Sequence, residues 1–333
     1  MARRDRTTGL PRPRARTQVK TPSRFSVSEG SQLRFVWIAG AVLIAVILAF
    51  WGWRWYDNNY RLPNKTILVV GEETFKLNYY ADRLFLAAQA GGGANLTILE
   101  QTLLTDLEDE ALAEKVARDK GITVNDDEIT NEIATQLGVP VGGAGSSFDA
   151  LYRQRLASVK MSDDHYRRFT EAQVWIQKLG AYYESEIGTT DELVTLRTIM
   201  SPTKEASEAV LTRVNGGENF GSVAQTESTD LDSRQKDGLM EPEPPLLLPD
   251  AIQVTIDGKT AGTTVYGPID VEGTWWVFQL DTRNPEGEIT ETQKAQLADI
   301  KRTDAVLAQR ANTDIDQRMT TKTYEWANEH AAD

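Results

Sequence analysis

The chain has 333 residues, with 36 basic and 49 acidic side chains, two histidines and no cysteine. The absence of cysteine excludes disulfides, zinc–thiolate sites and thiol nucleophiles together. Any site that needs a histidine pair would have to bring His165 and His330 together. The acidic excess also disfavours a nucleic-acid partner, because such a surface repels phosphates.

The first 56 residues combine a basic tail with a long apolar segment. Residues 1–34 carry nine basic side chains against two acidic ones, and the nineteen residues from 35 to 53 carry no charge. A helix of that length spans roughly 28 Å at ~1.5 Å per residue, close to the ~30 Å hydrocarbon core of a bilayer. Aromatic side chains that favour the membrane–water interface crowd its two ends: Trp37, Trp51, Trp53, Trp55 and Tyr56.

These features predict a transmembrane signal anchor at residues 35–56 behind a basic cytoplasmic tail at residues 1–34. The positive-inside rule then gives a single-pass protein of the cell membrane whose body lies outside the cytoplasm. A buried core helix and a cleaved signal peptide are the alternatives, but the run is long and its Trp-rich end is a poor cleavage site. Without the tail's nine basic and two acidic residues, 27 basic and 47 acidic residues remain, a net charge of −20 for residues 54–333.

Residues 64–188 are predicted to form a helical domain that opens with a short strand. Residues 66–70 are apolar and rich in β-branched side chains, which is typical of a strand. Asn125 and Glu128 have the spacing of a capping box at the start of a helix. A preceding helix is indicated by apolar residues at four-residue steps: Leu99, Leu103, Leu107 and Ala111.

Residues 189–284 are predicted to form a compact α+β domain. Residues 193–200 alternate like a half-buried strand, and a helix from Lys204 ends at Asn215-Gly-Gly. Two further strands are expected around Pro268 and over residues 274–281, joined by a turn at Glu272-Gly273.

Residues 285–333 are predicted to be a polar helical tail. Its longest helix covers residues 291–310, and its mixture of charges is typical of a solvated helix face. The fold class is therefore α+β, with a transmembrane helix, a helical domain, a smaller α+β domain and a C-terminal helix.

The helical segment resembles the N-terminal chaperone domain of the SurA and PrsA class of envelope folding factors. Residues 67–71 stand where that family has its opening strand. Residues 112–129 follow its pattern of a leucine- and alanine-rich helix, then Gly-Ile-x-Val, then an acidic helix start. An ordinary helical bundle is the alternative. The resemblance implies a chaperone that binds unfolded, newly exported polypeptides, with a C-terminal tail that can pack back on the chaperone domain.

The segment from Leu193 to Arg283 resembles a parvulin-type peptidyl-prolyl isomerase domain. Its matches follow the family's order along the chain, from the opening "R-H-I-L" strand to the closing "G-P-V" and "G-Y-H-I-I-K". The segments that carry the resemblance are residues 196–200, 215–220, 227–230, 267–269 and 275–280.

The resemblance implies catalytic positions, and the chain departs from the family at two of them. Parvulins usually place two histidines beneath the catalytic pocket with a Cys or Asp at its rim. Thr198 stands at the first histidine position, and Trp276, or Trp275 if the alignment shifts by one, stands at the second. Asp230 matches the rim acid, although a solvated turn carboxylate is an equally good interpretation of it.

The resemblance also implies a substrate-binding set. The apolar residues that clasp the proline correspond to Leu247, Leu248 and Ile252. Trp275 and Trp276 must face opposite sides of their strand. One of them is therefore expected to line the groove and the other to pack in the core, unless both are core residues.

Prolyl isomerisation makes and breaks no covalent bond. The enzyme lowers a rotational barrier of ~18–20 kcal/mol that arises from amide resonance. An apolar cleft weakens that resonance, and complementarity to the twisted amide stabilises the transition state. Loss of the histidines is therefore expected to leave weak or absent catalysis. The sequence contains no phosphate loop, metal-ligand cluster or hydrolase triad, so we expect no cofactor and no metal.

The leading hypothesis is a membrane-anchored extracytoplasmic folding factor. It would be a parvulin-type isomerase, a chaperone, or both, with unfolded polypeptides and their Xaa-Pro segments as partners and one helix in the membrane. A second hypothesis is a non-catalytic holdase that uses a retired isomerase fold. A third is a membrane-anchored scaffold for an envelope complex.

Overall fold

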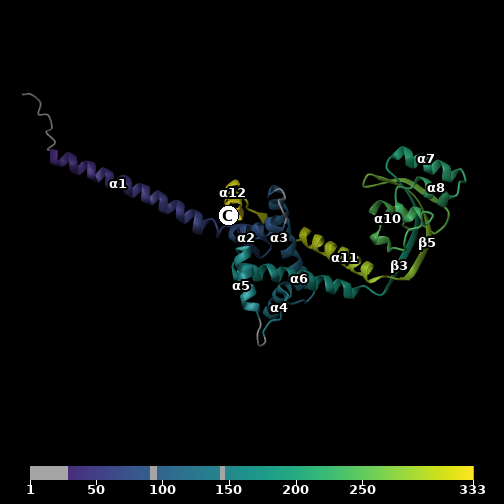
Figure 1. The fold of residues 1–333 in the computed structure, drawn as a ribbon, viewed down its shortest axis with the longest axis horizontal. Coiled ribbons are helices and arrows are strands. Elements are labelled where there is room, and N and C mark those ends of the chain that lie inside the picture. Colours follow the sequence, from purple (N-terminus) through teal and green to yellow (C-terminus); the bar gives the residue numbers. More distant parts are fainter. Residues whose placement is uncertain (1–28, 91–95, 143–146, 333) are drawn as a thin grey trace, which may run out of the picture. The chain divides into compact units, whose positions relative to one another are not determined.

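The computed structural model describes residues 29–90, 96–142 and 147–332 (Figure 1). The chain divides into two compact units, Met1–Arg61 and Leu62–Asp333. Of the predicted basic tail, residues 1–28 lie outside the described residues. The mixed α+β fold class is confirmed.

In the described residues of the first unit, one long helix, α1 (Glu29–Tyr56), is followed by the π-helical turn η1 (Asp57–Arg61). Its residues Trp37–Arg61 form a stretch of 25 residues that is long and apolar enough to cross a membrane, by length and composition, and none of it is buried. A helix makes its backbone hydrogen bonds within its own segment. A long apolar sequence can therefore adopt it where no water is available to the backbone.

The second unit begins with the strands β1 and β2 and five helices. The loop between the strands turns at Gly71, whose φ of 59° favours glycine. Apolar faces of α2, α3 and α6 meet in the largest core cluster, around Leu84, Leu107 and Leu179. The elements are β1 (Thr66–Val70), β2 (Glu73–Lys76), α2 (Leu77–Ala90), α3 (Leu96–Asp119), α4 (Asp126–Leu137), α5 (Phe148–Val159) and α6 (Asp163–Glu186).

The predicted capping box at the start of α4 is confirmed. The Asn125 side chain accepts a hydrogen bond from the Glu128 backbone N–H at 3.0 Å, and the Glu128 carboxylate accepts one from the Asn125 N–H at 2.9 Å. Glu128 also binds the Lys178 ammonium of α6 at 2.6 Å. The local sequence therefore fixes the start of α4, and Glu128 also supplies one of its long-range contacts with α6.

A second sheet occupies residues 190–288, which we call the sheet region. Its strands have the order β3-β5-β4, and both pairings are antiparallel. The β4–β5 hairpin turns at Glu272 and Gly273, with φ values of 50° and 85°. The elements are β3 (Thr190–Ser201), α7 (Lys204–Asn215), α8 (Phe220–Glu227), α9 (Leu231–Arg234), η2 (Pro245–Leu247), α10 (Asp250–Ile256), β4 (Val265–Val271) and β5 (Thr274–Glu288).

Helices cover both faces of this sheet. On one face, Ile199 and Val277 pack with α7 and α8; on the other, Leu196, Phe278 and Leu280 pack with Leu248 and α10. The alternation of strand side chains separates the two clusters. Backbone hydrogen bonds from residues 238–243 also pair the outer edge of β3.

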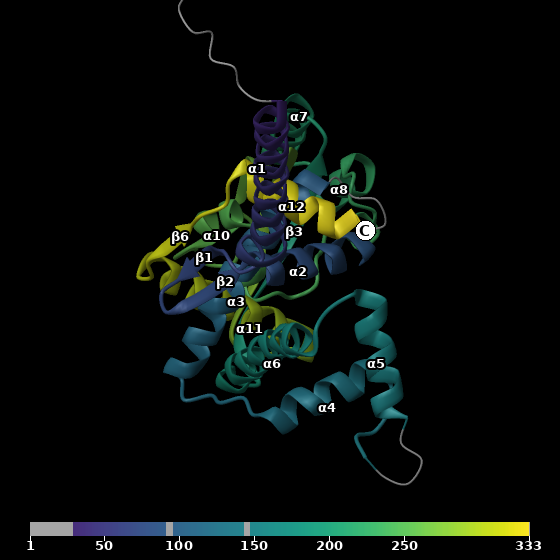
Figure 2. The ribbon, with the colours of Figure 1, turned by 90° about the vertical axis from the view of Figure 1, so that its left-hand side faces the viewer.

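The C-terminal segment returns to the helical part of the unit. Helix α11 (Glu291–Ala311) packs on α3 and α6, and α12 (Thr321–Ala332) packs on α2 (Figures 1 and 2). Between them, β6 (Ile315–Gln317) pairs with β1. The sequence predicts only helix here, because a half-exposed three-residue strand carries no apolar alternation of its own.

Candidate functional site

Thr198 and Trp276, the predicted catalytic pair, lie on the same face of the β3-β5-β4 sheet. Thr198 stands opposite Phe278 and Trp276 stands opposite Met200, so the pair are diagonal neighbours across the ladder. Thr198 is fully buried and Trp276 is 8% exposed. Both positions are therefore inside the core.

Leu248 and Ile252, two of the predicted proline-clasping residues, pack over this face. They share a buried cluster with Trp276 and Phe278. Indole is much larger than imidazole, and here it fills the space between the sheet and α10. The sheet face that the resemblance assigns to catalysis is thus closed by apolar packing.

The structure places the other predicted substrate-binding residues elsewhere. Trp275 faces the opposite side of β5, where the Lys204 ammonium lies 5.8 Å from its ring centroid. Leu247 packs with Ile187 and Leu297 in a separate cluster beside α11. The predicted substrate-binding set therefore does not converge on one surface.

Asp230 begins the short helix α9. Its carboxylate accepts a hydrogen bond from the Ser233 backbone N–H at 3.0 Å. Burial acts to raise the pKa of Asp230, but the hydrogen bonds from Ser233 and from the backbone of Asp232 hold that pKa below its ordinary value. Hydrogen bonds from Met200 to Ser228 and from Thr229 to Met200 fix this turn at the end of β3. The carboxylate thus serves as a helix cap.

The Thr198 hydroxyl has no hydrogen-bond partner among the described residues. Its backbone N–H donates to the Gly238 carbonyl at 2.7 Å. A side chain at Gly238 would approach the Thr198 carbonyl oxygen to 2.9 Å, and its φ of 82° also favours glycine. A solitary buried hydroxyl cannot form the paired polar network that two histidines would form there.

Both histidines lie in the helical part of the unit. The His165 ring nitrogen Nδ1 lies 2.7 Å from an Asp82 carboxylate oxygen. The His330 ring stacks on Trp326 with a centroid separation of 3.6 Å. Neither residue belongs to the sheet region, and within the described ranges no His, Asp and Glu side chains are grouped so as to hold a metal ion.

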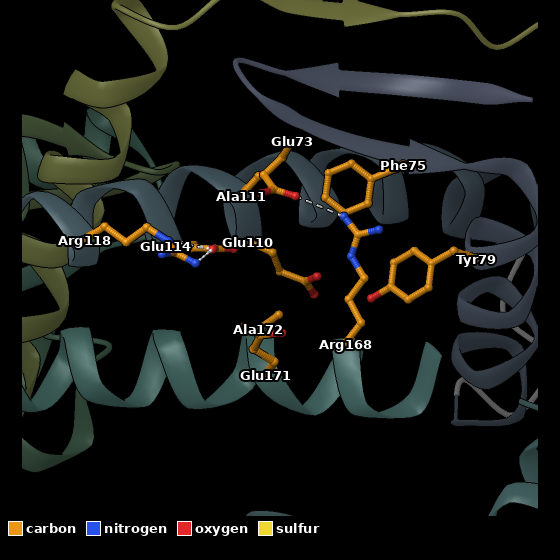
Figure 3. Close-up of a pocket in the computed structure, with 10 residues that line it drawn as sticks. All are labelled: Glu73, Phe75, Tyr79, Glu110, Ala111, Glu114, Arg118, Arg168, Glu171 and Ala172. Atoms are coloured by element: carbon orange, nitrogen blue, oxygen red, sulfur yellow. Dashed lines mark hydrogen bonds and ion pairs between the residues drawn. The ribbon is translucent and has the colours of Figure 1, made fainter. Parts of the chain in front are cut away.

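A cavity of about 160 Å³ lies between β2, α2, α3 and α6 (Figure 3). The Arg168 guanidinium lies 4.5 Å from the Phe75 ring centroid and 5.0 Å from that of Tyr79, and it binds the Glu73 carboxylate at 3.3 Å. Figure 3 shows these side chains and Glu110 converging on the cavity. The lining is Glu73, Phe75, Tyr79, Glu110, Ala111, Glu114, Arg118, Arg168, Glu171 and Ala172.

A buried ion pair supports this cavity. Arg83 binds Glu110 through two hydrogen bonds of 2.7 and 2.9 Å, with side chains only 8% and 12% exposed. Arg83 also donates to the Tyr79 hydroxyl at 3.0 Å and lies over the Phe169 ring. Desolvation acts to lower the pKa of Arg83, but the Glu110 carboxylate raises it overall. The contacts join α2, α3 and α6.

Another cavity, of about 330 Å³, lies between α3, α6 and α11; we call it the α11 cleft. Leu307 is 55% exposed at this cleft, beside the buried Val306. Burial and the neighbouring Glu110 raise the pKa of Asp106 at the same cleft. The lining is Asp106, Asp109, Glu110, Ala113, Ile176, Arg302, Thr303, Val306 and Leu307.

The resemblance implied a C-terminal tail that can pack back on the helical domain, but sequence reasoning named none of the residues that line the α11 cleft. The charge mixture of residues 291–310 indicates a solvated face, whereas part of α11 packs on α3 and α6. The available signal was the adjacent apolar pair Val306 and Leu307 within a charged helix. One of them packs inward and the other stays exposed at the rim.

One comparison with known proteins finds a family that is similar to the N-terminal part of the chain. The model of the SurA-like N-terminal domain family matches residues 29–180. This range contains α1 and every helix up to most of α6. Residues 29–180 are thus similar to a SurA-like N-terminal domain, and we call this range the SurA-like domain. No curated protein matches the chain. In the second unit, α11 and α12 pack on helices of the SurA-like domain.

Three solved structures illustrate the likeness. The peptidyl-prolyl isomerase PrsA of Bacillus cereus is 13% identical, with 81% of this chain and 100% of that chain covered and a TM-score of 0.41. PrsA of Bacillus anthracis is 12% identical, with 67% and 94% covered and a TM-score of 0.38. A SurA-like chaperone of Campylobacter jejuni is 13% identical, with 58% and 93% covered and a TM-score of 0.27. At TM-scores this low we draw no conclusion from these likenesses.

Proposed function

We propose that the protein is a membrane-anchored folding factor that binds unfolded, newly exported polypeptides outside the cell membrane. The observation that carries this proposal is the SurA-like domain at residues 29–180. In this proposal residues 35–56 are the anchor, residues 64–188 the chaperone domain, residues 189–284 a parvulin-like domain and residues 285–333 the C-terminal tail. The exposed apolar surface of α1 supports the anchor.

The α11 cleft is the proposed client site. Unfolded chains expose apolar side chains, and a chaperone must offer them apolar surface beside a polar rim. Leu307, Val306 and Ile176 supply the apolar surface, while Asp106 and Arg302 supply the rim. The cleft lies between the SurA-like domain and the C-terminal helix.

We further propose that the parvulin-like domain has at most weak isomerase activity. An isomerase needs an open apolar cleft that admits the prolyl ring and its amide. Here Trp276, Leu248 and Ile252 are packed against one another and are at most 8% exposed. The residue that matches the rim acid, Asp230, caps α9.

The test uses the full chain in lipid nanodiscs. Exchange NMR on short Xaa-Pro peptides measures isomerisation, and light scattering of a chemically unfolded client measures suppression of aggregation. We expect suppression of aggregation together with exchange close to that in buffer. Failure to suppress aggregation would refute the chaperone.

Prolyl isomerisation is the second candidate function. The observation that favours it is that Leu248 and Ile252 lie over the same sheet face as Thr198, where the resemblance places the substrate proline. Exchange faster than buffer in the same experiment, slowed by Ile252→Ala, would establish this activity.

A further inference from the structure

The end of α1 carries a surface pocket on one side of the helix. The pocket has a volume of about 290 Å³ and continues from α1 into the turn η1. Two indoles, one guanidinium and two carboxamides line it at helical spacing: Trp51, Arg54, Trp55, Asn58 and Asn59.

Arg54 supplies an uncompensated positive charge at this pocket. The nearby Asp57 carboxylate is bound by Arg61 at 3.3 Å. Within the described part of the chain, no carboxylate lies at ion-pair distance from Arg54. A guanidinium stays protonated at every physiological pH and offers five N–H donors in a planar fork.

The surroundings of Arg54 are apolar but have polar edges. The side chains of Trp51 and Trp55 are 72% and 67% exposed. The Asn59 amide donates to the Trp55 carbonyl at 2.9 Å, which holds that carboxamide against the helix. Indole rings favour the depth where hydrocarbon meets headgroups.

The sequence places the pocket at the outer boundary of the proposed span. Arg54 is the first charged residue after the uncharged residues 35–53. A helix over that run crosses roughly 28 Å at ~1.5 Å per residue, so Arg54 reaches the headgroup level. This placement rests on the membrane anchor of the proposed function.

We propose that this pocket binds the phosphate of a phospholipid headgroup in the outer leaflet. The guanidinium fork of Arg54 matches two phosphate oxygens, which is the bidentate geometry that arginine favours. Trp51 and Trp55 pack beside the glycerol backbone and the first acyl carbons. A lipid satisfies both the charge and the apolar walls, whereas a soluble phosphate satisfies only the charge.

The experiment uses the full chain in nanodiscs of phosphatidylglycerol and phosphatidylcholine. Native mass spectrometry after release from the disc counts the phospholipids that remain bound. The wild type should keep a bound phospholipid that Arg54→Gln loses. Lys65→Gln is the charge-matched control and should keep it, because the exposed Lys65 lies outside the pocket. Added inorganic phosphate should not displace the lipid.

Three results would overturn this inference. The first is equal lipid retention by wild type and Arg54→Gln. The second is equal loss of the bound lipid in Arg54→Gln and in the control variant. The third is displacement by inorganic phosphate, which would make the ligand a soluble anion. Alkaline extraction of the wild type from membranes separates the two proposals. If alkali extracts the wild type, both the membrane anchor and the lipid site are refuted. If the wild type resists extraction but holds no bound lipid, only the lipid site is refuted.

Discussion

Trp275 and Trp276 are adjacent in the sequence but have different environments in the fold. Trp276 is buried with Ile252 and Phe278, whereas Trp275 is half-buried beside Lys204. Strand alternation predicts that the two side chains face opposite sides of the sheet, but it does not say which of the two is buried. Only the packing of α10, a contact between residues distant in sequence, decides which tryptophan is the core residue.

Truncation of the two tryptophans should therefore have unequal effects on stability. Trp276→Ala removes a buried ring and should lower the free energy of unfolding by ~3–5 kcal/mol. Trp275→Ala should cost clearly less, because its ring is already in partial contact with water. Urea unfolding monitored by circular dichroism measures both variants. Equal losses would contradict the assignment of faces.

Asp230→Ala should destabilise the protein in a pH-dependent manner. Loss of an N-cap costs ~0.5–2 kcal/mol. The pKa of this carboxylate is lowered in the folded state, so its contribution is present above its unfolded pKa, ordinarily ~3.9, and is lost as pH falls through the folded pKa. The difference in the free energy of unfolding between wild type and variant should be largest near pH 7 and should shrink in acid. A difference that grew as the pH fell would contradict the assignment of Asp230 as the helix cap.

At the scale of elements, local signals predicted the segments and long-range contacts arranged them. The capping box of Asn125 and Glu128 was visible because both partners lie within four residues. Strand β6 was not visible, because its three residues are ordered only by pairing with β1. The lining residues of the α11 cleft were also not visible, since α11, α3 and α6 meet there from distant parts of the chain.

The ion pair between α2 and α3 should matter more than the exposed pair on α3. Glu110→Ala leaves the buried Arg83 charge without its carboxylate and should cost ~3–5 kcal/mol. Glu114→Ala breaks the exposed pair with Arg118 and should cost at most ~1 kcal/mol. Thermal unfolding of both variants tests this order. A larger loss in Glu114→Ala would refute the structural role given to Arg83 and Glu110.

At the scale of the whole molecule, the C-terminal segment packs on helices of the SurA-like domain. Helix α11 closes one side of the α11 cleft, and Gln293 at its start donates to the Pro242 carbonyl at 2.9 Å and to Glu243 at 3.0 Å. One helix thus contacts both the SurA-like domain and the sheet region. The resemblance predicted the order of the segments and a tail that can pack back on the helical domain, but it did not predict the contacts of Gln293 with the sheet region.

The most direct test of the proposed function is suppression of client aggregation by the full chain in nanodiscs. Leu307→Glu places a charge at the apolar rim of the α11 cleft. Val254→Glu is the matched control, because Val254 is 80% exposed on α10, outside that cleft. Wild type and Val254→Glu should suppress aggregation equally, and Leu307→Glu should lose most of the suppression. Full suppression by Leu307→Glu would contradict the assignment of this cleft as the client site.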